Sequence, residues 1–226
     1  MAVRFVLLLI GAYLLGAVPV AYIAARLYKG IDIRQYGSGN VGATNVIKST
    51  NVWIGTLVII LDLVKGVAMV WVAKLLDMGI ASQTAIGVAA VIGHNWSVFL
   101  GFNGGRGLLI TLGLAAFLPI MNNLIPWGLL VLTVIAVTGL FVTHDTALGV
   151  LLGVISLPLV TWWTGQPMAL TLGFLAMLII MVIRRLTAPS SRFGESVSRA
   201  ELMMNRFLFD RDIRDRKTWL SRSPGT

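Results

Sequence analysis

The chain has 226 residues, of which 57% are hydrophobic and only 12% are charged, and its formal net charge is +9. Soluble domains carry roughly 25% charged residues, so too few polar side chains remain here to cover a water-facing surface, which argues against a soluble protein. The sequence contains no cysteine, which excludes disulfides, thiolate nucleophiles and cysteine-ligated metals. Because only two histidines and scattered acids remain as ligands, we expect neither a metal site nor a cofactor.

The first apolar run, residues 5–25, predicts a membrane-spanning helix near the N-terminus. It is long enough to cross roughly 30 Å of hydrocarbon at about 1.5 Å per residue. Arg4 precedes the run, and Arg26 follows it. Signal peptides have a shorter apolar region and a small-residue cleavage site, so we expect this segment to be retained as the first span.

Six further apolar runs predict six further helices, because an unpaired backbone group finds no partner in lipid. They cover residues 52–76, 82–100, 107–121, 124–143, 146–163 and 167–183. The predicted fold class is therefore all-α, a polytopic integral membrane protein with about seven transmembrane helices. In the run 146–163, Gly149 and Gly153 form a small-xxx-small pair that allows two helices to approach closely.

The distribution of lysine and arginine predicts the orientation of these spans. Basic residues concentrate in the loop after the first span, at Arg106 and after the last span. Short loops rich in lysine and arginine stay cytoplasmic, so we expect the N-terminus outside and the C-terminus in the cytoplasm.

The charge pattern also divides the chain into two parts. From Arg184 to the end there are ten lysine or arginine residues and five acidic ones. We therefore expect a transmembrane domain over residues 1–186 and a basic, polar cytoplasmic tail over residues 187–226. Basic segments beside a membrane are attracted to anionic head groups, so membrane lipids rather than nucleic acid are the expected partner of the tail.

Residues 37–48 form a glycine-rich segment that combines three glycines with Ser38, Thr44, two asparagines and Lys48. Glycine and asparagine tolerate positive φ, so such a backbone can turn tightly and expose successive N–H groups. Exposed N–H groups at the start of a helix, with a lysine nearby, favour an anion such as phosphate. An ordinary loop between two spans is the alternative.

Residues 93–107 form a second glycine-rich segment, which ends in Gly-Gly-Arg-Gly at the start of the next span. Its N–H groups and Arg106 again favour phosphate, because a guanidinium can donate two hydrogen bonds to one phosphate. Arg106 can equally be a simple topology signal. His94 fits either a general base or phosphate donor, or a structural hydrogen-bonding residue at a helix end.

Asp62 and Lys65 lie three residues apart in the second predicted span, on one face of the helix. Charges inside a membrane are rare and usually paired. We expect a structural ion pair, with a direct catalytic role as the alternative.

The two glycine-rich segments resemble the PlsY-type family of bacterial acyl-phosphate:glycerol-3-phosphate acyltransferases. Residues 38–48 match its Ser-Gly-Asn-x-Gly-Ala-Thr-Asn-x-x-Arg, with Lys48 at the arginine position. Residues 93–107 match its Gly-His-x-x-Pro-x-Phe-x-x-Phe-Lys-Gly-Gly-Lys-Gly, with three replacements, at Ser97, Asn103 and Arg106.

Two weaker matches accompany them. Residues 62–66 match the family's Asp-x-x-Lys-Gly, and residues 143–148 resemble its Thr-Arg-Tyr-x-Ser-Leu, with His144 at the arginine position. The similarity extends over roughly residues 1–183, and seven spans with this orientation are also what the family fold implies.

The resemblance implies transfer of an acyl group from acyl phosphate to glycerol 3-phosphate, which gives lysophosphatidic acid. It implies a bacterial plasma membrane protein with its active site on the cytoplasmic face, and no need for acyl-CoA, acyl carrier protein or a metal. The catalytic residues would be Ser38, Lys48, His94 and Arg106. The residues that bind or shape the substrate phosphate site would be Gly39, Asn40, Gly42, Thr44, Asn45, Gly104 and Gly105.

The family's third motif, His-x-x-Asn-x-x-Arg-x-x-x-Gly-x-Glu after the last span, is missing here. Its histidine and asparagine are absent, and Pro189 would stop the helix that the motif needs. Two phosphate-bearing substrates bring about three to four negative charges. We expect Arg184, Arg185 or Arg192 to supply the lost positive charge, with lipid anchoring of the last span as the alternative.

Two other functions fit a divergent member of this kind. One is a catalytically weakened relative that binds lipid phosphates. The other is a transporter of a phosphorylated solute, although transporters usually carry internal inverted repeats and mid-membrane charges, and no repeat is visible in this sequence.

Overall fold

The computed structural model describes residues 2–143, 146–189, 194, 196–215 and 218–219. Within these ranges all regular structure is helical, which confirms the all-α class. The helices are α1 (Ala2–Ala17), α2 (Val20–Lys29), α3 (Ala43–Ser49), α4 (Val52–Leu75), α5 (Ile80–Asn95), α6 (Leu108–Met121), α7 (Trp127–Thr143), α8 (Thr146–Trp163), α9 (Met168–Leu186) and α10 (Arg199–Phe209), with short 3-10 helices η1 (Ile33–Gln35) and η2 (Val98–Leu100).

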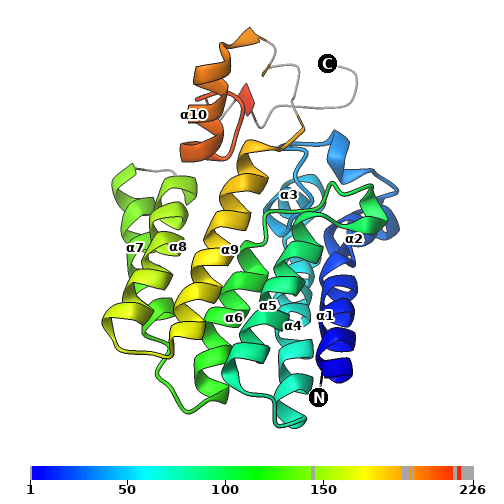
Figure 1. The fold of residues 1–226 in the computed structure, drawn as a ribbon. Helices are drawn as coiled ribbons and strands as arrows, with labels where there is room; N and C mark the ends of the chain where they lie inside the picture. Colours follow the sequence, from blue (N-terminus) through cyan, green and yellow to red (C-terminus); the bar gives the residue numbers. More distant parts are fainter. Residues whose placement is uncertain (1, 144–145, 190–193, 195, 216–217, 220–226) are drawn as a thin grey trace.

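Helices α1 and α4 to α9 run side by side as a bundle, and α2, α3 and α10 gather at one end of it, opposite the N-terminus (Figure 1). Four helical stretches of the described chain are long and apolar enough to cross a membrane: Ala2–Lys29, Val52–Leu75, Thr146–Trp163 and Met168–Leu186. Helices α6 and α7 are also apolar but shorter. Helices occupy all seven predicted runs, while the count of seven membrane crossings stays a prediction.

The first run is divided into two helices, where the sequence predicted one. The break falls at Val18 and Pro19, between α1 and α2. Proline has no N–H to donate and disfavours helical geometry in the residue before it. The carbonyl of Val18 instead accepts a hydrogen bond of 2.9 Å from Lys65 Nζ of α4, so the break is stabilised from a neighbouring helix.

Helix α5 ends earlier than the predicted run 82–100, because contacts with α1 replace its next turn. The helix stops at Asn95, and the chain continues through η2. Tyr13 donates from its hydroxyl to the Trp96 carbonyl at 3.0 Å, and Ser97 donates to the Ala17 carbonyl. These bonds fix the start of the second glycine-rich segment against α1.

Glycines bring neighbouring helices into close contact. A Cβ on Gly16 of α1 would collide with the Ala90 carbonyl of α5. Between α7 and α8, Gly139 lies against Gly149, and Gly153 packs against the backbone of Leu132. The prediction that Gly149 and Gly153 allow close helix approach is therefore confirmed.

Candidate active site

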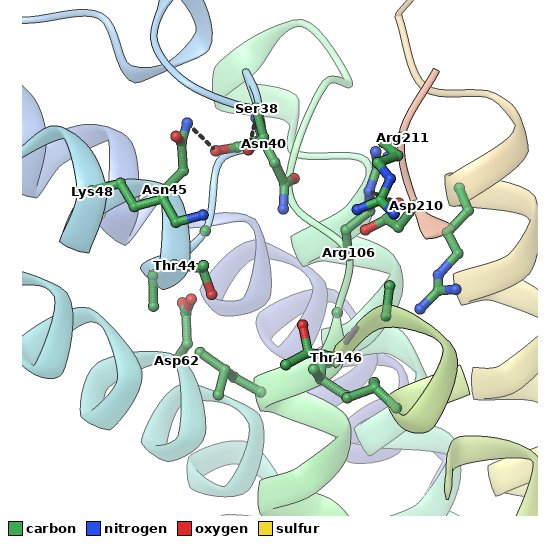
Figure 2. A pocket seen from close by; sticks show the side chains of 18 of the residues that line it. Ser38, Asn40, Thr44, Asn45, Lys48, Asp62, Arg106, Thr146, Asp210 and Arg211 are labelled. Atoms are coloured by element: carbon green, nitrogen blue, oxygen red, sulfur yellow. Dashed lines mark hydrogen bonds and ion pairs between the residues drawn. The ribbon is translucent and has the colours of Figure 1, made fainter. Parts of the chain in front are cut away.

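A cavity of about 320 Å³ opens at the end of the bundle where both glycine-rich segments lie (Figure 2). Regions that are far apart in sequence form its walls: the segment 38–48, the middle of α4, the end of α5, the start of α6, the start of α8, the end of α9 and the turn after α10. Polar walls come from the glycine-rich segments and the tail, and apolar walls come from the bundle, at Ile59, Leu108, Leu109, Ala147 and Val150.

Asn45 organises the first glycine-rich segment. Its side-chain amide is buried and donates to the carbonyls of Ile33, Tyr36 and Asn40 at 3.1, 2.9 and 3.1 Å. The amide nitrogen is therefore occupied by the loop itself, which favours a shaping role over the direct phosphate contact that its place in the phosphate-binding set implied. Gly37 has φ +53 and packs against Asn45, so a side chain there would be both strained and obstructed.

Ser38, Thr44 and Lys48 lie on one wall of the cavity. Thr44 and Lys48 are exposed on α3 and are four residues apart, so they share one face of that helix. The Ser38 hydroxyl accepts a long hydrogen bond of 3.4 Å from the Asn40 backbone N–H. Figure 2 shows Lys48 and Thr44 facing Arg106 across the cavity.

Gly104 and Gly105 do not offer their N–H groups to the cavity, contrary to the sequence-based expectation. Gly104 N–H donates to the Asn95 carbonyl at 3.2 Å, and Gly105 N–H donates to the His94 carbonyl at 3.0 Å. A Cβ on Gly104 would collide with the His94 carbonyl, and a Cβ on Gly105 would collide with the His94 ring. These glycines therefore close the second segment tightly onto the end of α5 instead of donating to a ligand.

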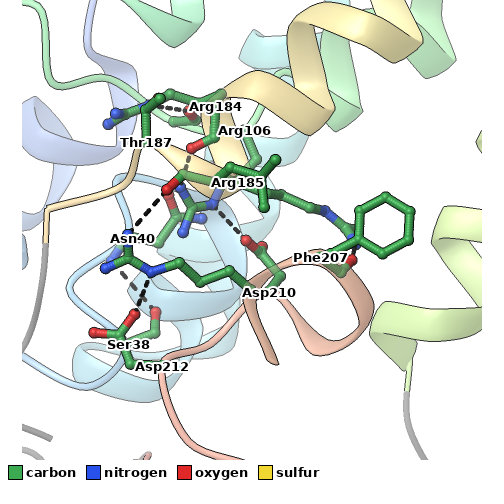
Figure 3. Close-up of polar contacts among 12 residues, drawn as sticks. Ser38, Asn40, Arg106, Arg184, Arg185, Thr187, Phe207, Asp210 and Asp212 are labelled. Atoms are coloured by element: carbon green, nitrogen blue, oxygen red, sulfur yellow. Dashed lines mark hydrogen bonds and ion pairs between the residues drawn. The ribbon is translucent and has the colours of Figure 1, made fainter. Parts of the chain in front are cut away.

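Arg106 follows this junction and lies between the tail and α9 (Figure 3). Its Nε forms an ion pair of 2.7 Å with the Asp210 carboxylate, and its Nη1 donates to the Arg184 carbonyl at 3.0 Å. These contacts engage Nε and Nη1 of the guanidinium, which also lines the cavity.

Asp62 and Lys65 form the predicted structural ion pair, with 2.9 Å between Lys65 Nζ and an Asp62 carboxylate oxygen. Both side chains are buried. His94 Nδ1 is 3.9 Å from the same carboxylate oxygen, which is too long for a hydrogen bond. His94 is almost fully buried against Gly105, so its position supports the second segment, and it also lines the cavity.

The tail contributes residues that the sequence analysis missed. Phe209, Asp210, Arg211 and Trp219 line the cavity. Ser198 caps α10 and accepts a hydrogen bond of 3.2 Å from the Glu201 N–H. The Ser-x-x-Glu spacing in the sequence was a usable signal for this helix. No local signal, however, indicates that the turn after this helix folds back onto Arg106 of the second glycine-rich segment.

A second, smaller cavity of about 120 Å³ adjoins the first and shares with it Ser38, Asn40, Arg106, Arg211 and Trp219. Its further basic residues are Arg34, Arg184 and Arg206. Arg34 donates to the Asp32 carboxylate at 2.6 Å and thereby holds the pKa of Asp32 below its usual value. The two cavities together form a strongly basic region at one end of the bundle.

The arginines at the end of α9 have separate roles in this region. Arg184 donates to the Gly104 and Gly105 carbonyls at 3.0 and 3.3 Å, so it braces the second glycine-rich segment. Arg185 lines the larger cavity and donates to the Phe207 carbonyl at 3.0 Å. Arg192 and His144 lie outside the residues that the structure describes.

Such a site can bind phosphate and hold an apolar chain beside it. Lys48 and Arg106 approach from two different segments, and Arg185 and Arg211 add positive charge. In the parts of the chain that the structure describes, no cluster of three or more histidine or acidic residues could hold a metal ion. The arrangement favours chemistry by positioning and charge stabilisation.

Comparison with known proteins agrees with this geometry. The family model described as glycerol-3-phosphate acyltransferase matches residues 6–192. Glycerol-3-phosphate acyltransferase 5 of Dehalococcoides mccartyi is 42% identical over 99% of this chain and 95% of its own length. The glycerol-3-phosphate acyltransferase of Halalkalibacterium halodurans is 36% identical over 88% of this chain and 95% of its own.

Two solved structures are also similar. Both are crystal structures of PlsY, an integral membrane glycerol 3-phosphate acyltransferase, one in its glycerol 3-phosphate form and one in its lysophosphatidic acid form. They superpose with TM-scores of 0.72 and 0.71, at 31% and 30% identity, over 80% of this chain and 88% of theirs. The chain therefore belongs to the glycerol-3-phosphate acyltransferase family and is an integral membrane enzyme.

Proposed function

We propose that the protein transfers an acyl group from acyl phosphate to glycerol 3-phosphate, which yields 1-acylglycerol 3-phosphate (lysophosphatidic acid) and inorganic phosphate. The observation that carries this proposal is the larger cavity, where basic residues from two glycine-rich segments meet an apolar wall of the bundle. A phosphate and an acyl chain can lie there side by side.

The reaction needs little from the protein beyond positioning. A hydroxyl oxygen of glycerol 3-phosphate attacks the acyl carbonyl, the bond from the carbonyl carbon to the phosphate oxygen breaks, and the hydroxyl proton leaves with inorganic phosphate. Because the donor is already activated by its phosphate, fixed positive charges and correct orientation are sufficient help. In this scheme Lys48 and Arg106 hold phosphate, and Ser38 and Thr44 donate hydroxyl hydrogen bonds.

The other predicted residues support this site. Gly39, Asn40, Gly42 and Asn45 shape the first segment, and His94 with Gly104 and Gly105 supports the second. The Asp62–Lys65 pair stabilises the helices at the cavity, which Asp62 also lines. In the proposed division into a transmembrane domain, residues 1–186, and a tail, residues 187–226, the tail contributes Phe209, Asp210, Arg211 and Trp219 to the wall of the cavity.

The proposed topology has seven spans, with the N-terminus outside a bacterial plasma membrane. Both glycine-rich segments, α10 and most basic residues lie at one end of the bundle, and the N-terminus lies at the other (Figure 1). Because basic loops stay cytoplasmic, this arrangement favours an active site on the cytoplasmic face, where glycerol 3-phosphate is available.

A transfer assay with the full-length protein tests this function. Protein purified in detergent or lipid would be given acyl phosphate and labelled glycerol 3-phosphate, with acyl-CoA as the comparison donor. We expect labelled lysophosphatidic acid and one inorganic phosphate per transfer with acyl phosphate, and no product with acyl-CoA. Binding of glycerol 3-phosphate without transfer from any acyl phosphate would instead identify a catalytically weakened relative.

A further inference from the structure

The tail forms part of the active-site walls, although it lies beyond the residues that the family model matches. That match ends at residue 192, whereas Arg211 and Trp219 line both cavities. Figure 2 shows Arg211 and Asp210 beside Arg106, on the side of the cavity opposite Lys48. The tail therefore reaches the region where the proposed substrates carry their negative charge.

A set of buried contacts fixes the turn that carries Arg211. Arg206 Nε forms an ion pair of 2.7 Å with Asp212, and its Nη1 donates to the Leu186 carbonyl at 2.9 Å. Asn205 donates to the Asp212 carbonyl at 3.2 Å. Because α9 ends at Leu186, these bonds tie the turn after α10 to the end of the last bundle helix.

Arg211 is itself placed by this turn. Its side chain is 8% exposed, and its guanidinium lies 5.1 Å from the centre of the Phe209 ring. A cation over an aromatic face is held in a limited set of orientations. The charge of Arg211 is thus presented at the wall that the two cavities share.

The charges around the cavities show why an additional cation is needed. Two phosphate-bearing substrates bring about three to four negative charges. Asp210 pairs with Arg106 at 2.7 Å and partly offsets its charge, and Arg184 is directed at the Gly104 and Gly105 carbonyls. Lys48, Arg106 and Arg185, which also lines the larger cavity, therefore supply fewer positive charges than the two substrates bring.

We propose that Arg211 binds the phosphate of a substrate, an acyl phosphate or a phosphate monoester, so that the tail completes the active site. This inference rests on the proposed function and deepens it. The ligand chemistry is the same for both substrates, and separate Michaelis constants distinguish which phosphate Arg211 contacts.

The first test compares Arg211→Gln with Arg214→Gln in the full-length protein. Arg214 is exposed, lies three residues further along the same tail and lines neither cavity. We expect Arg211→Gln to raise the KM for glycerol 3-phosphate, acyl phosphate or both at least about tenfold, as loss of a charge-assisted bond to phosphate does. Arg214→Gln should leave both KM values within about twofold. The same small change in Arg211→Gln would overturn the proposal.

The second test restores the positive charge by chemical modification. It compares one variant before and after modification, so it does not depend on two variants folding equally well. The chain has no cysteine, so Arg211→Cys offers a single reactive thiol. We expect 2-aminoethyl methanethiosulfonate, which adds a cation, to lower the raised KM again, whereas its neutral methyl and anionic sulfonatoethyl counterparts should not. Equal effects of the cationic and neutral reagents would overturn a role for the charge.

Ligand protection separates this proposal from the proposed function. Glycerol 3-phosphate or inorganic phosphate should slow labelling of the cysteine introduced at position 211 in membranes, and glycerol alone should not. If the wild-type protein transfers no acyl group, the proposed function fails, while phosphate protection still supports the assignment of Arg211. Equal labelling rates with phosphate and with glycerol would contradict it.

Discussion

Lys48 and Arg106 face the same cavity from two different segments. Lys48 lies on the short helix α3, and Arg106 contacts Asp210 and the Arg184 carbonyl. Each charge-assisted bond to phosphate contributes about 1.5–3 kcal/mol. We therefore expect Lys48→Ala and Arg106→Ala each to lower kcat/KM at least about tenfold, measured with acyl phosphate and glycerol 3-phosphate.

Two controls make this prediction specific. Lys48→Arg should keep most activity, because the family's pattern has arginine at this position. Lys74→Ala removes the same side chain at the opposite end of the bundle, where Lys74 contacts Asn122, and should leave kinetics unchanged. Normal kinetics in both alanine variants at the site would reduce Lys48 and Arg106 to topology signals.

Gly105 tests the packing of the second glycine-rich segment. A Cβ at this position meets the His94 ring and the Val41 carbonyl, so Gly105→Ala must push the two segments apart. Overpacking of this kind costs about 1–3 kcal/mol. We expect a lower thermal unfolding midpoint and lower activity, whereas Gly79→Ala, with open space around it, should leave activity unchanged. An unchanged midpoint in Gly105→Ala would contradict the tight junction.

At the residue scale, sequence and structure agree on residue types more than on roles. Ser38, Thr44, Lys48 and Arg106 all reach one cavity, as the glycine-rich patterns indicated. The Gly104 N–H, which was expected to donate to a ligand, instead donates to the Asn95 carbonyl at the end of α5. Which donor pairs with which acceptor depends on the fold around the loop, and the spacing of glycines does not contain that information.

At the scale of helices, the Asp62–Lys65 pair joins α4 to the break between α1 and α2. Lys65 contacts both Asp62 and the Val18 carbonyl, and both charged side chains are buried. Removing one partner of a buried pair leaves an uncompensated charge, at a cost of about 3–5 kcal/mol. We expect Asp62→Asn to lower the thermal unfolding midpoint in detergent markedly.

The double variant distinguishes pairing from other roles of these residues. Asp62→Asn combined with Lys65→Met removes both charges, so its unfolding midpoint should recover most of the loss. If the double variant is less stable than the single one by the full cost of a second substitution, the two side chains do not act as a pair.

The positions of the helices followed from the sequence, whereas the end of α5 did not. Each apolar run is helical, because a lipid-facing backbone has no other way to satisfy its polar groups. The break at Pro19 was readable from the sequence, since proline weakens the helix before it. The end of α5 at Asn95 depends on bonds from Tyr13 and Ser97 to partners far along the chain, so no local pattern could predict it.

For the whole molecule, the topology can be tested with single cysteines in this cysteine-free chain. Gln35 and Met204 lie at the end that carries α3 and α10, and Asn123 lies in the connection between α6 and α7. An impermeant thiol reagent applied to intact cells should label only Asn123→Cys, because the basic end faces the cytoplasm in the proposed topology. Gln35→Cys and Met204→Cys should react after the cells are opened.

Labelling of Gln35→Cys or Met204→Cys from outside would show that the orientation is the reverse of the proposed one. The association of the tail with the two glycine-rich segments belongs to the same scale, and no sequence pattern indicates it. It depends on Arg206, Asp212 and the Leu186 carbonyl meeting in space, which is a property of the folded chain.

The larger cavity joins a polar wall to an apolar wall formed by residues such as Leu109 and Val150. In the proposed reaction glycerol 3-phosphate, the acceptor, therefore reaches the cavity from water. The amphiphilic donor, acyl phosphate, reaches it from the membrane surface. The relevant donor concentration is its mole fraction in the bilayer. Adding inert phospholipid at a fixed total amount of acyl phosphate should lower the initial rate, whereas adding more vesicles of the same composition should leave the rate per enzyme unchanged.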